Sequence, residues 1–283
     1  MIDGKSFSKF KHPRQRPRAI LASLFSLLLF PVIAVLIVAG TVGLIVPLIV
    51  LILWIATRVA FTNVMGNSVL VSELNYPRIF ALSEEVKAQL NYDKPIHIFV
   101  YQQGEFNAFM RKFFFRRAVF LNSEMVEKGV TDDELRWVIG RFVGYWRARR
   151  RSGLMGGIIR LAQRFIIFNF FILPYERAMV YTGDRLALGV INGDIGTAVS
   201  AMQKLFVGRA LGYSVNPAGI IQQHRRVKGS IFAFFARLYT MFPHQTARYV
   251  DLIAFAQRMY PEQYAKFNAE NPGLPSDLQH LSS

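Results

Sequence analysis

The chain has 283 residues, no cysteine and a formal net charge of +16. The absence of cysteine excludes disulfides, thiol catalysis and any zinc site that uses Cys ligands. Only 18 % of the residues are charged and 52 % are hydrophobic, whereas soluble domains carry about 25 % charged residues, so we expect part of the chain to contact lipid.

The first predicted element is strongly apolar. Residues 19–57 contain no charged side chain, which is too long a run for one span because a bilayer core takes roughly 20 helical residues. The run predicts a two-span transmembrane helical hairpin over residues 19–58; a cleaved signal peptide, the alternative, has a much shorter apolar core. Residues 1–18 form a basic tail and Arg58 follows the second span. Positively charged flanks stay in the cytoplasm, so we expect a multi-pass membrane protein with both termini cytoplasmic.

The remaining sequence predicts a mostly α-helical domain with a small β-sheet, of the α+β class, over residues 59–267. Residues 268–283, which are rich in Pro, Gly and Ser, are expected to form a flexible tail. Apolar periodicity and turn residues predict, in chain order, a helix over 76–91, strands over 96–101 and 118–121, and helices near 176–192, 194–207, 217–239 with a break at Gly229, and 244–260. The apolar segment Ile158–Leu173 contains two arginines, which favours an interfacial helix or a buried core helix over a third span.

One helix start is well marked. Thr131 followed three residues later by Glu134 forms a capping box, in which the two side chains bond each other's backbone N–H groups. The predicted helix runs from there to about Arg151, and its basic C-terminal end complements the helix dipole.

Several short stretches around this helix share the order of a known family. They are Asn107-Ala108-Phe109, the strand end Val119-Phe120-Leu121-Asn122-Ser123, the run from Thr131 to Ile139, and later Arg177, Asp184 and Arg248. Their order resembles the HtpX-type membrane zinc metallopeptidases, the gluzincin group that includes the CAAX prenyl endopeptidases. The resemblance implies a gluzincin-like, degenerate peptidase domain over residues 59–267 and, with the predicted spans, a bacterial inner membrane location.

The resemblance does not extend to the family's chemistry. Its helix carries H-E-x-x-H, in which two His residues bind zinc and the Glu acts as a base, and a later helix supplies a third ligand. Arg141 stands at the first His, Phe142 at the Glu, Tyr145 at the second His, and Val180 at the third ligand. Because Arg cannot ligate a metal and Phe cannot transfer a proton, we predict no metal, no cofactor and no enzymatic activity.

Two sets of residues are candidates for other roles. The Arg141 guanidinium is expected to occupy the space of the metal and to form a structural pair with Asp184; the alternative places Arg141 at the surface. The family's edge segment, matched by Asn107, Ala108 and Phe109, holds an extended peptide, so a peptide edge is one interpretation. In the other interpretation, Asn107 only stabilises a turn.

Together these expectations describe a membrane-anchored pseudopeptidase that binds a polypeptide or regulates a partner at the membrane. The alternatives are an active membrane metalloendopeptidase with a non-standard site and a structural membrane component. Expected partners are a lipid bilayer with anionic headgroups and a polypeptide or membrane protein. Nucleic acid is not expected, because no recognised nucleic-acid module contains the basic clusters.

Overall fold

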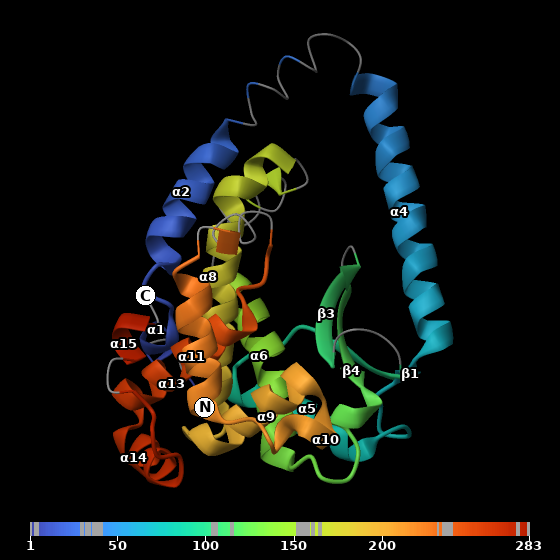
Figure 1. The fold of residues 1–283 in the computed structure, drawn as a ribbon. Helices are drawn as coiled ribbons and strands as arrows, with labels where there is room; N and C mark the ends of the chain where they lie inside the picture. The colour runs from blue at the N-terminus through green and yellow to red at the C-terminus, as the bar shows by residue number, and fades with distance from the viewer. Residues whose placement is uncertain are drawn as a thin grey trace.

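The structure, a computed structural model, describes residues 2, 6–28, 31, 35, 42–102, 107–113, 116–150, 159, 162–163, 166–230, 232–233, 240–275 and 278–281. This part of the chain is mostly helical with one small mixed sheet (Figure 1), in agreement with the predicted α+β class. Its helices are α1 (Phe7–Phe10), α2 (Gln15–Leu27), α4 (Val42–Asn67), α5 (Pro77–Gln89), α6 (Asp132–Arg150), α8 (Ile166–Val190), α9 (Ile195–Val207), α10 (Arg209–Gly212), α11 (Pro217–Lys228), α13 (Gln245–Met259), α14 (Pro261–Glu270) and α15 (Leu278–Leu281), with a 3-10 turn at Ser123–Met125.

The sheet has the order β1-β2-β4-β3, with β2 and β4 parallel and the other pairs antiparallel. Its strands are β1 (Val69–Leu70), β2 (His97–Tyr101), β3 (Ala108–Phe113) and β4 (Arg116–Asn122). One face packs against α4 through Phe61, and the opposite face joins the main helical core through residues such as Val100 and Leu121. Figure 1 shows the sheet between α4 and the helical body. The sequence predicts β2 and β4 but misses β3, whose charged and aromatic residues resemble a connection.

The predicted transmembrane hairpin over residues 19–58 is wrong. No helix among the described residues is long and apolar enough to cross a membrane. The side chains of residues 42–47 and of Val50 are not among those described. α2 has 13 residues, short of the roughly 20 that a bilayer core requires, and polar residues including Arg58 and Asn63 interrupt α4. The predicted multi-pass location in a bacterial inner membrane with both termini cytoplasmic is therefore corrected too.

Both helices nevertheless expose many apolar side chains. They are Ile20, Leu21, Leu24, Leu27 and Leu28 at the end of α2, and Leu48, Ile49, Leu51, Ile52, Leu53, Trp54, Ile55 and Val59 in α4. The opposite side of α2 packs against α8, where Phe25 stacks on Phe171 with 3.5 Å between ring centroids. The apolar surface of this region is thus only partly covered by the protein itself.

α6 and α8 form the centre of the helical body, and glycines allow their backbones to touch. A Cβ atom at Gly183 would lie 2.5 Å from the carbonyl oxygen of Arg141, and one at Gly144 would lie 3.1 Å from the carbonyl oxygen of Gly183. Real Cβ atoms do not approach other atoms as closely as 2.5 Å. The absence of side chains at this crossing therefore brings residues 141–145 of α6 directly opposite residues 180–184 of α8.

α8 also contains part of the apolar segment Ile158–Leu173, for which the sequence favoured either an interfacial helix or a buried core helix. From residue 166 on, the segment Ile158–Leu173 forms the first third of α8, and Pro174 lies inside the helix. Ile172 is fully buried and Leu173 nearly so. Only the end of the segment therefore agrees with the buried-helix alternative, because Phe170 is 45 % exposed. Residues 158, 160–161 and 164–165 lie outside the described residues.

Residues near both ends of the chain are buried. Phe7 is fully buried, Phe10 is 6 % exposed, and a Cβ atom at Gly189 of α8 would clash with the Phe10 ring at 2.7 Å. His12 stacks on Tyr181 of α8, and its backbone N–H donates to the Thr182 hydroxyl at 3.0 Å. At the other end, α14 and α15 follow α13, and Leu278 is fully buried.

The α6–α8 crossing gives a direct test. We expect Gly183→Ala to destabilise the protein by about 2–3 kcal/mol, because the new methyl group forces two backbones apart. The control is Gly219→Ala in α11, where a Cβ atom meets nothing within 4 Å and the higher helix propensity of Ala is expected to stabilise by up to ~1 kcal/mol. Urea unfolding measures both; equal effects of the two substitutions would contradict the close packing at Gly183.

His12 gives a pH-dependent test. Burial, aided by the charge of Arg185, lowers the pKa of His12 to about 3 from its ordinary 6.5. Below pH 6.5 the unfolded chain therefore binds a proton that the folded chain excludes, so stability is complete above pH 6.5 and is lost as pH falls toward 3. The expected loss is about 1.4 kcal/mol per pH unit.

The measurement is urea unfolding at pH 7, 6 and 5. We expect His12→Phe to remove this part of the acid sensitivity, and His280→Gln, at an exposed position, to keep it. An unchanged pH slope in His12→Phe would show that His12 titrates normally in the folded protein.

Candidate functional site

The positions that the sequence resemblance aligns with a metal site lie close together in this fold. Arg141, Phe142 and Tyr145 project from α6 toward Val180 and Asp184 of α8, around a cavity of about 10 Å³. The lining is completed by Met110 of β3, Phe242, and Arg248 of α13. A cavity of this size holds about one water molecule, so a whole substrate does not fit inside it.

The chemistry of the lining follows from its residue types. A guanidinium, a phenyl ring, a phenol and an isopropyl group occupy positions 141, 142, 145 and 180. Within the described parts of the chain, no group of three or more His, Asp or Glu side chains is arranged to hold a metal ion. Phe142, Val180 and Phe242 can neither bind a metal nor move a proton, and the thioether of Met110 is not among the usual ligands of zinc.

Asp184 is the electrostatic centre of the site. Arg248 donates two hydrogen bonds to its carboxylate, from Nε to Oδ2 at 2.7 Å and from Nη2 to Oδ1 at 2.6 Å. Arg141 lies farther away, with Nε 3.6 Å from Oδ1. The structure thus brings Arg141 and Asp184 within ion-pair distance, but the main partner of Asp184 is Arg248, which sequence reasoning matched to the family without assigning it this role.

Arg141 is buried, in contrast to the alternative that placed it at the surface. Its side chain is 7 % exposed, and its guanidinium lies over the rings of Trp137 and Phe142, 5.5 and 5.0 Å from their centroids. Burial, followed by the positive charge of Arg248, lowers the pKa of Arg141 to about 9, against the raising effect of Asp184. The site therefore holds a cation in an environment that opposes its charge.

Tyr145 belongs to a second buried network. Its hydroxyl donates to Glu176 and accepts from Arg149 at 2.6 Å, and Gln163 donates to the other Glu176 oxygen at 2.6 Å. Burial and the negative charge of Glu176 raise the pKa of Tyr145 well above its ordinary value of 10. The phenol therefore stays protonated and committed to Glu176, and it is not available as a base.

The predicted peptide edge lies on β3. The side-chain amide of Asn107 donates to the carbonyl oxygens of Lys204 and Leu205 at 3.1 and 3.2 Å, which ties the start of β3 to the end of α9. Ala108 and Phe109 belong to β3 itself, and Phe109 stacks on Phe120 of β4. These contacts favour a structural role for the Asn107 side chain, and they leave the backbone of β3 as the part able to contact a peptide.

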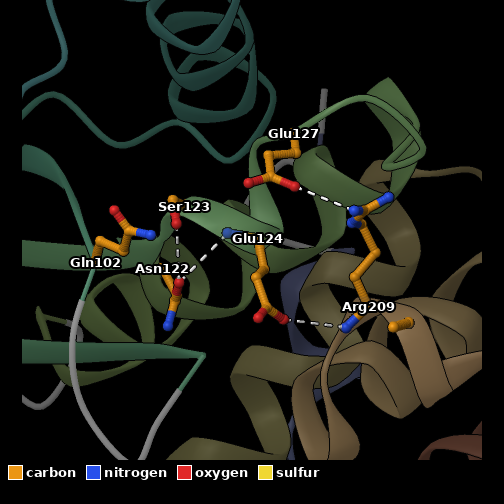
Figure 2. A pocket seen from close by; sticks show the side chains of 7 residues that line it. Gln102, Asn122, Ser123, Glu124, Glu127 and Arg209 are labelled. Carbon is orange, nitrogen blue, oxygen red and sulfur yellow. Dashed lines mark hydrogen bonds and ion pairs between the residues drawn. The ribbon is translucent and has the colours of Figure 1, made fainter.

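A second, larger cavity was not predicted from the sequence. It has a volume of about 360 Å³ and lies beyond the carboxyl ends of β2 and β4 (Figure 2), lined by Gln102, Asn122, Ser123, Glu124, Glu127, Arg209 and Ala210. Arg209 pairs with Glu127 at 3.1 Å, and its backbone N–H reaches Glu124 at 3.4 Å. Because Arg209 is far from the glutamates in sequence, no local pattern reveals this cavity.

Comparisons with protein-family models, with curated proteins and with solved structures found no match for this chain. The resemblance to the HtpX-type metallopeptidases therefore stays a prediction that rests on the order of short motifs.

The geometry around Asp184 predicts unequal mutational costs. We expect Asp184→Asn to destabilise by about 3–5 kcal/mol, because it leaves two buried guanidinium groups without an anion. Arg141→Met is expected to cost less than about 1 kcal/mol, since Asp184 keeps both hydrogen bonds from Arg248. Urea unfolding of the single and double variants provides the measurement.

Asp133→Asn serves as the control, because Asp133 is an exposed acid on α6 whose ion pair with Arg136 contributes at most about 1 kcal/mol. In the double variant the costs should not add, since Arg141 interacts with Asp184 directly. Strictly additive losses would show that the two side chains do not interact.

Proposed function

We propose that this protein is a non-catalytic relative of the HtpX-type metallopeptidases that binds an extended polypeptide along β3. The observation that carries the proposal is the convergence of Arg141, Phe142, Tyr145 and Val180 on one small cavity beside that strand. In the family, these positions carry the metal site next to the bound peptide. Here the positions converge while their chemistry is gone, which favours retained binding over hydrolysis.

The absence of catalysis is supported by the nature of the lining. Hydrolysis of a peptide by a zinc enzyme requires about three metal ligands and an open position for water. Arg141 is a donor without acceptor capacity, and Tyr145 is held protonated by Glu176. An active metalloendopeptidase with a non-standard site, the alternative, needs metal ligands outside these positions.

The binding of a polypeptide is supported by the place of β3 at the end of the sheet order. Asn122 N–H bonds to the Asn107 carbonyl oxygen at 2.9 Å, so the alternating pattern of an antiparallel pair directs the N–H and C=O groups of Ala108, Met110 and residue 112 away from β4. An edge of this kind pairs with an added strand. Met110 also lines the cavity, so a peptide on β3 passes close to Arg141.

Two features prepare β3 for a partner. The hydrogen bonds from Asn107 to α9 fix the start of the strand, and Phe109 stacks on Phe120 on the face of the sheet that packs against α4. A strand that is already ordered loses less entropy when a peptide pairs with it. A structural role through the exposed apolar surfaces of α2 and α4 is the second candidate function, and the lipid partner stays a prediction that bears on those surfaces.

The proposed function is tested with a fluorescein-labelled peptide of alternating Val and Thr residues that carries one central Asn. We expect it to bind the full-length protein, and we expect Met110→Pro to weaken binding by about tenfold, because proline removes an outward N–H group and one backbone hydrogen bond. Fluorescence anisotropy measures the Kd.

Met110→Leu is the matched control, since it keeps the backbone N–H and a similar side-chain volume. Equal Kd values for the Pro and Leu variants would exclude pairing along β3. Stoichiometric zinc in the purified protein, together with peptide cleavage that a chelator abolishes, would instead support the active-enzyme alternative.

A further inference from the structure

The cavity between α6 and α8 contains an excess of positive charge. Arg141, Arg248 and Asp184 are 7 %, 2 % and 1 % exposed, and together they carry two positive charges and one negative charge. The five other lining side chains, Met110, Phe142, Tyr145, Val180 and Phe242, are uncharged. A buried charge without a counter-charge is costly, so an anion in this place would be stabilised.

The two arginines are not equivalent in their hydrogen bonding. Arg248 donates twice to Asp184. The Arg141 guanidinium makes an ion pair at 3.6 Å and two contacts with aromatic rings, and it donates no hydrogen bond to another described residue. A guanidinium has five N–H donors, so Arg141 retains donors for a ligand at the cavity that it lines.

The shape of the site restricts the ligand. The cavity of about 10 Å³ accepts roughly one atom of the size of oxygen. Phe242 lines it and is 40 % exposed, so the cavity lies close to solvent. A guanidinium donates to carboxylate oxygens, and a single carboxylate oxygen matches the size of the cavity.

We propose that Arg141 forms a carboxylate-binding site in place of the family's metal. The carboxylate comes from an acidic side chain or the C-terminus of a polypeptide on β3, or from a small free acid. In the first case the inference rests on the proposed function, since Met110 of β3 lines the same cavity. The rings of Trp137 and Phe142 beside Arg141 exclude water and strengthen the charge interaction.

The first experiment uses sodium formate and does not depend on a peptide. We expect formate to raise the Tm of the full-length protein by about 2–4 °C in a saturable manner, and sodium chloride at the same ionic strength to have a smaller effect. Arg141→Met should lose the formate response while still unfolding cooperatively. Arg141→Lys, which keeps the charge but not the fork, should show a weakened response.

Arg136→Gln is the matched control, because it removes the same charge from a partly exposed position of α6 that does not line the cavity, and it should keep the full response. Equal Tm shifts with formate in the wild type and Arg141→Met would overturn the inference, since the effect would then be a general ionic one. A chloride response equal to the formate response would also overturn it, because the site would not recognise carboxylates.

The second experiment compares two peptides that differ only in a central Asp or Asn. We expect the Asp peptide to bind the wild type about tenfold more tightly and this preference to vanish in Arg141→Met. If both peptides bind equally in all variants, the carboxylate site fails and the proposed function stands. If neither binds while the formate response still needs Arg141, the proposed function fails and the site for a free acid stands.

Discussion

The rest of this structure depends on the direct contact between the backbones of α6 and α8. Gly144 and Gly183 leave no side chain between the helices, and a Cβ atom at Gly183 would lie 2.5 Å from a carbonyl oxygen of α6. This contact sets Arg141 and Tyr145 opposite Val180 and Asp184. It also fixes the buried charges, because Asp184 meets its partners only when α6, α8 and α13 are all in place. Packing and electrostatics are therefore coupled: the glycines permit the approach, and the carboxylate links the three helices.

Local sequence signals predicted the parts of the fold that local chemistry determines. The capping box was confirmed, since Thr131 and Glu134 exchange hydrogen bonds with each other's backbone N–H groups at 2.8 and 3.2 Å. Asp194 caps α9 in a similar way through Thr197. Elements stabilised by distant contacts were missed. β3 has a basic, aromatic sequence, and only its register with β4 shows that it is a strand. Likewise, nothing local distinguishes the apolar N-terminal half of α8 from an interfacial helix.

In the candidate site too, some features follow from local sequence and others depend on distant contacts. The spacing of Arg141 and Tyr145, four residues apart on one helix, places them on a common face, whereas their approach to α8 was expected only from the family resemblance. The role of Arg248 could not be derived from the sequence, because its hydrogen bonds to Asp184 join residues that are 64 positions apart. Buried charges of this kind depend on tertiary contacts that no short pattern encodes. The burial of His12 against Tyr181 is similar: a histidine in a basic N-terminal stretch resembles a solvated residue until the fold covers it.

Replacing a metal by a guanidinium changes what a site is able to do. A zinc ion accepts electron pairs, so it polarises a carbonyl group and lowers the pKa of a bound water. A guanidinium only donates hydrogen bonds, so it attracts an anion but cannot activate water. Both are cations, and each can be stabilised by a nearby carboxylate such as Asp184. In the proposed function, Arg141 places a positive charge beside β3 without the electron-pair acceptor that hydrolysis needs. This arrangement favours the recognition of acidic groups, because the guanidinium is positively charged but cannot accept an electron pair from a ligand as a metal does.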